Sequence, residues 1–145
     1  MNNLGFVIFV AVLAGGAAVL QGRFMGNMDQ AMGTWESVFI TYGSGGLLVG
    51  LFMLYLRGGN LTLWQEVPWY SFFAGVMGLV IVSGIGYAVP RLGLVGTFTG
   101  FTAAQFILAA IFDHFGWLTT DIRPLGASQL MGMAILLLGA WLILR

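Results

Sequence analysis

Two glutamines interrupt the most apolar stretches of this chain: Gln21 ends the run GGAAVLQ, and Gln105 lies within AAQFILAA. A side-chain amide carries two N–H donors and a carbonyl acceptor, and leaving them unpaired in apolar surroundings costs several kcal/mol. Each amide must therefore face other protein groups or water. The chemistry open to both is hydrogen bonding, either to a solute in a cavity or to a neighbouring helix, where such bonds contribute about 0.6 kcal/mol on average.

The neighbours of both amides suit a cavity wall. Residues three, four and seven apart share a face of a helix, so Gln105 shares its face with Thr102 and two phenylalanines, while small alanines surround Gln21. Two amides in different apolar stretches, each beside small or aromatic residues, favour a cavity as much as interhelical bonding. The expected substrate-cavity residues are Gln21 and Gln105, with Thr102, Tyr42 and Ser83 as further candidates.

The charged residues offer less chemistry. Asp113 and His114 end one apolar stretch, and Glu36 begins another, where a carboxylate suits a helix N-terminus. Because histidine titrates near neutral pH, these three residues are candidates for a gate or proton site, and simple solvation of helix ends is the alternative. Nothing resembles a nucleophile beside a base, so we expect no enzyme. One histidine without any cysteine predicts no metal site, and no cofactor is expected.

Composition defines the elements that must position these residues. The chain is 59% hydrophobic and 7% charged, whereas a soluble domain carries about 25% charge. This composition predicts an all-α integral membrane protein with a single membrane domain over residues 1–145, because about 20 helical residues cross a hydrocarbon core. Five transmembrane helices are expected, over about 4–28, 35–56, 68–89, 92–115 and 126–144.

Glycines recur at intervals of four along the expected helices. This spacing lets the backbones of two membrane helices approach closely. We therefore expect these glycines to pack helices rather than to bind a solute. The expected packing positions are Gly22, Gly26, Gly46, Gly50, Gly96 and Gly100.

The charges of the loops do not choose an orientation in the membrane. Cytoplasmic loops normally carry the excess of Lys and Arg, but this chain has no Lys, and its five arginines alternate between the two sides of the expected helices. The alternation favours dual topology, in which copies insert both ways and two of them form an antiparallel, ten-helix, inverted-repeat dimer. A weak bias, with orientation set by some other feature, is the alternative. The absence of Lys also leaves no basic patch for nucleic acid.

Nearly the whole chain resembles the half-size, five-span YdcZ-type family of the drug/metabolite transporter superfamily. The similar segments are GGAAVLQ (15–21), PWYSFFAGVMG (68–78), PRLG (90–93), AAQFILAAIFDHFG (103–116) and LLLGAWLI (136–143). The most specific feature is the glutamine followed eight residues later by Asp and then His-Phe-Gly. The resemblance implies a transporter of small organic molecules or metabolites, pairing of two inverted copies, and family positions at Gln21, Gln105 and Asp113.

The residues predict a secondary transporter, and the resemblance implies small organic molecules or metabolites as its solutes and export as its direction. We expect it to work by alternating access as an antiparallel homodimer in the bilayer of a bacterial inner membrane. Pairing with an inverted homologue in place of a second copy is left open by the sequence. Two alternatives remain. A dual-topology ion channel would show flux that does not saturate, and a non-transporting scaffold or subunit would bind no solute.

Overall fold

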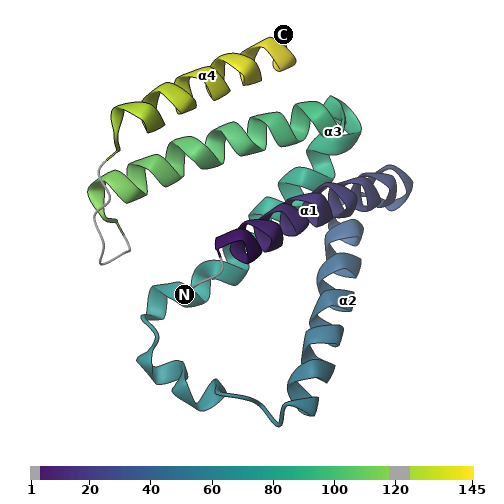
Figure 1. Ribbon diagram of the computed structural model, residues 1–145. Coiled ribbons are helices and arrows are strands. Elements are labelled where there is room, and N and C mark those ends of the chain that lie inside the picture. The colour runs from purple at the N-terminus through teal and green to yellow at the C-terminus, as the bar shows by residue number, and fades with distance from the viewer. Residues whose placement is uncertain (1–3, 118–124) are drawn as a thin grey trace. The chain divides into compact units, whose positions relative to one another are not determined.

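A computed structural model describes residues 4–117 and 125–145, and these residues confirm the all-helical architecture (Figure 1). The α-helices are α1 (Leu4–Met32), α2 (Thr34–Tyr55), α3 (Ala74–Phe115) and α4 (Ala127–Leu144), and two 3-10 helices, η1 (Leu61–Glu66) and η2 (Trp69–Phe73), precede α3. The expected span boundary near Gly126 is described, whereas most of the preceding connection, residues 118–124, lies outside the described residues.

Four helical stretches within the described residues are long and apolar enough to cross a membrane. α1, α2 and α4 have 29, 22 and 18 residues, and the fourth stretch, which joins η2 and α3 over Trp69–Phe115, has 47. At 1.5 Å per residue the fourth stretch would extend about 70 Å if straight, more than twice the thickness of a hydrocarbon core. Its backbone leaves the helical region at Gly93 (φ 72°, ψ 170°). The interruption divides it into two parts, each long enough for one crossing.

The helix ends differ from the expected spans in two places. α1 continues beyond residue 28 to Met32, because its polar end residues are compatible with a helix and Gly33 (φ 106°) is the first residue that turns the chain. The α-helical part of the third span begins at Ala74 rather than at Pro68, because the aromatic run between them forms the 3-10 helix η2. Aromatic residues lose side-chain freedom in an α-helix, so a run of them has a lower propensity for the α-helix.

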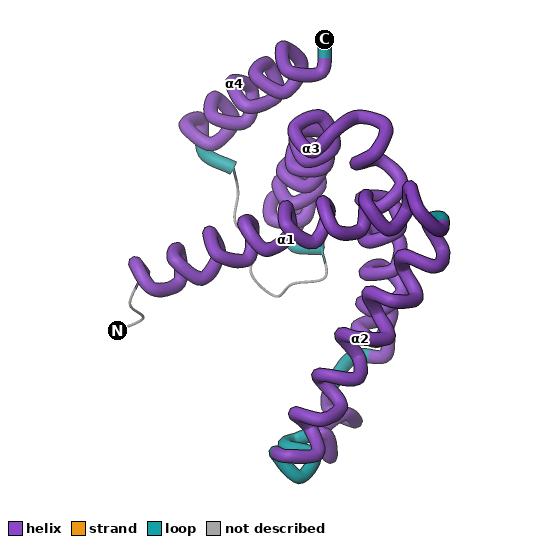
Figure 2. Tube along the Cα trace, turned by 90° about the vertical axis from the view of Figure 1, so that its right-hand side faces the viewer, coloured by secondary structure: helices purple, strands orange, loops and turns teal. Residues whose placement is uncertain are grey.

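The chain divides into two compact units, residues Met1–Arg91 and Leu92–Arg145. In the first unit, α1 and α2 diverge from the Gly33 turn, as Figures 1 and 2 show. The Gly33 N–H donates to the Asp29 carbonyl (3.0 Å), and the Gly33 carbonyl accepts from Ser37 N–H (3.2 Å). The positive φ of this turn is readily adopted only by glycine.

The core of the first unit lies where α3, before Gly93, joins the α1–α2 junction. Met25 and Ser37 are 1% and 0% exposed, and the Ser37 hydroxyl donates to the Met25 carbonyl. Gly86 makes room for Met25, since a Cβ at Gly86 would lie 3.2 Å from the methionine methyl carbon. Gly26 packs still closer, because a Cβ there would lie 2.8 Å from Val89 Cγ1. Small residues therefore allow three helices to meet at one point.

In the second unit, α4 runs back along the part of α3 that follows Gly93 (Figure 1). A Cβ at Gly96, near the start of this part, would lie 3.9 Å from Leu144 Cδ2 at the end of α4. Ala110 and Ala140 are buried between the two helices' faces, at 7% and 8% exposure. Only 6% of the residues of α4 are buried, so most of its side chains are left to contact lipid or further helices.

Candidate functional site

A groove of about 370 Å³ lies between α1 and α2, close to their junction. On α1, residues at intervals of three and four form one wall, because they share a face of the helix. A second helical face, on α2, forms the other wall. The lining residues are Ala17, Leu20, Gln21, Phe24, Met25, Met28, Ile40, Thr41 and Ser44.

Three polar side chains line this groove: Gln21, Thr41 and Ser44. The Thr41 hydroxyl donates to the Ser37 carbonyl, and the Ser44 hydroxyl donates to the Ile40 carbonyl, both at 2.8 Å. A hydroxyl whose proton is bonded within its own helix offers only oxygen lone pairs to a further partner. Gln21 is exposed and adds an amide with both donors and an acceptor. None of the lining residues is charged.

The other expected cavity residues of the first unit lie elsewhere. Tyr42 follows Thr41 on the next face of α2, and its hydroxyl would lie 2.5 Å from a Cβ at Gly78 of α3. Ser83, on α3, donates to the Leu79 carbonyl (2.6 Å) and is not among the groove's lining residues. Within this groove the structure therefore joins Gln21 to Thr41 and Ser44. The sequence signal for these two hydroxyls is the run TYGSGG (41–46), in which Tyr42 is the expected cavity residue.

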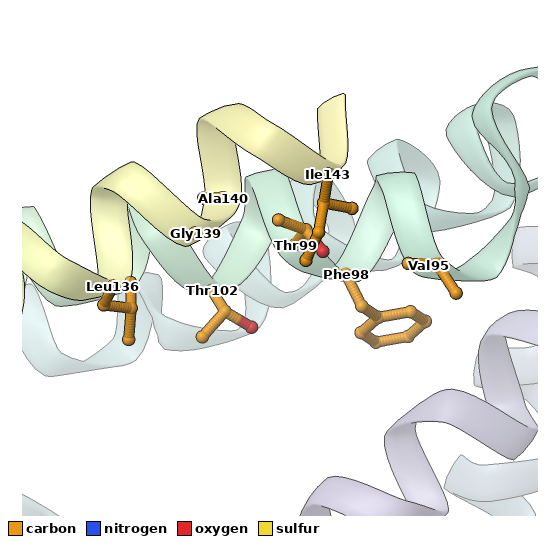
Figure 3. Close-up of a pocket in the computed structure, with 8 residues that line it drawn as sticks. All are labelled: Val95, Phe98, Thr99, Thr102, Leu136, Gly139, Ala140 and Ile143. Atoms are coloured by element: carbon orange, nitrogen blue, oxygen red, sulfur yellow. The ribbon is translucent and has the colours of Figure 1, made fainter. Parts of the chain in front are cut away.

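A second groove, of about 430 Å³, lies along α3 and α4 in the second unit, and Figure 3 shows its lining residues. Thr102, an expected cavity residue, lines it together with Phe98 and Thr99 of α3. The other walls come from Val95 and from α4. Gln105 is exposed on α3 and is not among the lining residues, although it lies only three residues after Thr102.

Asp113 and His114 lie near the end of α3 and are both exposed. Asp113 lines a groove of about 380 Å³ together with Gln129 of α4, whose carbonyl oxygen accepts from the Gly126 N–H (2.9 Å) and so caps that helix. His114 lines a neighbouring groove of about 360 Å³. Glu36, the third candidate for a gate or proton site, is exposed in the first turn of α2, beside Gly33.

One charged cluster was missed by sequence reasoning. Asp29, whose side chain is 6% exposed, accepts a hydrogen bond from the Thr34 hydroxyl and lies 3.4 Å from Arg91 Nη1. The same Arg91 nitrogen donates to the Tyr87 carbonyl (2.5 Å), and the guanidinium carbon lies 3.6 Å from the centre of the Tyr87 ring. This cluster joins the end of α1, the start of α2 and α3. No local pattern indicates it, because its members are far apart in sequence.

The expected packing glycines occupy different environments. Gly22 and Gly26 are buried in α1, and Gly26 contacts Val89 as described above. Gly96 lies near Leu92 and Leu144. A Cβ at Gly46, Gly50 or Gly100 would meet no atom within 4 Å. These three positions are therefore open to lipid or to another helix.

The comparisons with known proteins give one match. A family model described as "Putative inner membrane exporter, YdcZ" matches residues 6–142. No curated protein and no solved structure matches the chain. Among the described residues, no group of three or more histidine, cysteine or acidic side chains could hold a metal ion.

Proposed function

Because the chain belongs to the YdcZ family of inner membrane exporters, we propose that it is a secondary transporter that exports small organic molecules or metabolites. It is a multi-pass protein of the inner membrane. Transport proceeds by alternating access, in which a binding site opens to one side of the membrane and then to the other. The working unit is an antiparallel homodimer.

The observation that carries this proposal is the groove lined by Gln21. It places an amide and two hydroxyl oxygens together in walls that are otherwise apolar. A few polar groups in an apolar concavity are typical of small-molecule sites, and a volume of about 370 Å³ falls within their usual range of about 300–1,000 Å³. Polar residues inside membrane segments commonly mark substrate pathways, since they are costly to keep there otherwise.

The antiparallel dimer is supported by the balance of charge and by the exposed surfaces. The alternating arginines leave both orientations open to the chain. In each of the four described stretches that could cross the membrane, at most 11% of the most apolar part is buried. The exposed apolar faces are therefore available to a second copy. Two copies inserted in opposite directions reproduce the inverted repeats of larger transporters, whose substrate sites lie at the midplane.

In this proposal Gln21 contacts the transported solute directly. Gln105, Thr102, Tyr42 and Ser83 are candidates for further polar contacts with the solute. Asp113, His114 and Glu36 lie near helix ends, where they are candidates for a gate or a proton site. No catalytic role is assigned to any of them.

Efflux from reconstituted vesicles tests the proposal even though the substrate is unidentified. Vesicles containing the protein are loaded with a small-molecule extract of bacterial cells, and the loss of each compound is followed by mass spectrometry. At least one compound should leave faster than from protein-free vesicles, at a rate that saturates with its concentration. Gln21→Leu should abolish this loss, because it removes the amide. Gln30→Leu, an exposed position on the same helix outside the groove, is the matched control and should not.

Three results would contradict the proposal. Loss of compounds that does not saturate would indicate a channel. Equal retention by protein-containing and protein-free vesicles would indicate a scaffold or subunit. Equal rates for the native protein and Gln21→Leu would place the transport path elsewhere in the chain.

A further inference from the structure

We propose that the groove between α1 and α2 selects uncharged organic molecules that have an apolar body and donate hydrogen bonds. Hydroxylated or amide-bearing compounds are the class that fits. This inference rests on the proposed transport function and assigns a substrate class to the same groove. It follows from the charges, the hydrogen-bonding groups and the apolar walls that the groove presents.

The lining of the groove offers no counter-charge. All nine lining residues are uncharged. Asp29 follows the lining residue Met28 in α1. Its side chain is 6% exposed and is already bonded to the Thr34 hydroxyl and paired with Arg91. An ion that leaves water for an apolar groove loses its hydration and needs a partner charge or a dense set of hydrogen bonds in exchange. An uncharged solute avoids this cost.

The hydrogen-bonding groups of the groove are mostly acceptors. The Thr41 and Ser44 protons are engaged with the carbonyls of Ser37 and Ile40, so both hydroxyls present lone pairs only. The Gln21 carbonyl oxygen is a third acceptor, and the Gln21 amide nitrogen supplies the only donors among the lining side chains. A solute that donates from O–H or N–H groups can satisfy these three oxygens. A solute with acceptors alone can pair only with the Gln21 nitrogen.

The remaining walls define the body of the solute. Leu20, Phe24 and Ile40 provide apolar and aromatic surface, and Met28, which is less buried than its neighbour Met25, provides a flexible thioether side chain. Methionine adapts to different shapes, which suits a site that accepts several related molecules. The groove therefore fits an apolar or aromatic body with its polar groups gathered on one side, rather than a molecule that is polar all round.

A matched set of phenyl glucosides tests this substrate class by thermal stabilisation of the purified dimer. Phenyl glucoside is uncharged and rich in O–H donors. Phenyl glucuronide adds a carboxylate, the 6-amino-6-deoxy derivative adds an ammonium, and the tetra-O-methyl derivative loses every donor. Phenyl glucoside should stabilise the protein, and each of the other three should bind at least about tenfold more weakly, because a buried charge or an unpaired polar group is costly.

Substitutions in the groove separate its donors from its acceptors. Thr41→Val keeps the shape of the side chain and removes one acceptor, so it should weaken the binding of phenyl glucoside by about twofold to tenfold. Thr62→Val, at an exposed position in η1, is the matched control and should leave binding unchanged. Gln21→Glu places a carboxylate in the groove, and the order of preference should then change in favour of the ammonium derivative.

The outcomes distinguish a wrong substrate class from a wrong function. Binding of the glucuronide, or of the permethylated compound, as tight as that of phenyl glucoside would overturn the class, and so would a failure of phenyl glucoside to bind. The vesicle experiment then tests the transport function itself. If compounds leave the vesicles in a Gln21-dependent manner but are organic ions, the class is wrong and the transport function stands. If no compound leaves, the transport function itself is wrong.

Discussion

The Arg91 guanidinium lies 3.4 Å from the carboxylate of Asp29, although the two residues are 62 positions apart along the chain. Asp29 belongs to the last turns of α1, and Arg91 lies directly after Pro90 in α3. The carboxylate also accepts from Thr34, the first residue of α2. The ion pair and the Thr34 bond therefore link the end of α1 and the start of α2 to α3, at the junction beside the Gln21 groove.

Removing one partner of this ion pair should destabilise the protein. Arg91→Gln leaves a carboxylate with 6% exposure bonded only to Thr34, so the free energy of unfolding should fall by about 1–3 kcal/mol. Asp29→Asn should cost less, since an amide oxygen can still accept from Thr34 and Arg91 stays half-exposed. Thermal unfolding in detergent measures both variants, and Arg23→Gln, an exposed arginine on α1, is the control.

The double variant decides whether the two residues interact. If the pair stabilises the junction, the combined effect of Asp29→Asn and Arg91→Gln should fall short of the sum of the single effects by at least about 0.5 kcal/mol. Strict additivity would mean that each residue acts through its other contacts, Thr34 for Asp29 and Tyr87 for Arg91.

Two glycines of α1 should respond to alanine in opposite directions. Alanine favours a helix over glycine by about 0.8–1 kcal/mol. At Gly15 a Cβ meets no atom within 4 Å, so Gly15→Ala should raise the melting temperature or leave it unchanged. At Gly26 a Cβ would lie 2.8 Å from Val89 Cγ1, and the branched valine cannot easily move aside, so Gly26→Ala should lower it. Equal effects of the two changes would show that α1 and α3 are not in close contact at Gly26.

The helices could be predicted from the sequence because each consists of a long apolar run bounded by glycine, proline or polar residues. The all-helical architecture and the inner-membrane location are confirmed. The residues at which the helices begin and end were harder to predict. α1 extends to Met32 because polar residues can also be helical, and the 3-10 helix before Ala74 coincides with a run of aromatic residues. Neither is encoded in apolar periodicity.

The candidate site could be predicted only in part. Gln21 stands out in the sequence as an amide in an apolar run, and the structure places it in a groove. Thr41 and Ser44 share that groove and Tyr42 does not, because a single residue step turns the side chain by about 100° around the helix axis. Which face is turned towards Gln21 depends on how α1 and α2 cross, and a single sequence does not contain that angle. The Asp29–Arg91 pair likewise depends on where three helices meet.

Replacing the second glutamine tests whether it contacts the solute or joins helices. Gln105 is exposed on α3, so Gln105→Leu should reduce the export rate in the vesicle assay while the dimer stays intact in cross-linking. If the dimer dissociates and the remaining dimers export at the native rate, Gln105 joins helices and does not contact the solute. Leu108→Ala, also exposed on the same helix, controls for a general loss of packing.

An antiparallel homodimer requires the chain to insert in both orientations, and labelling of a single cysteine shows whether it does. The native chain has no cysteine, so Asn60→Cys introduces one thiol in the connection between α2 and α3, at the start of η1. An impermeant thiol reagent should label it from both faces of the membrane. Lysines added between Gly58 and Leu61 should hold this connection inside, and lysines added after Arg145 should impose the opposite orientation. Each fixed variant should be inactive alone, and the two expressed together should regain export. Labelling of the otherwise native Asn60→Cys protein from one face only would contradict the antiparallel homodimer.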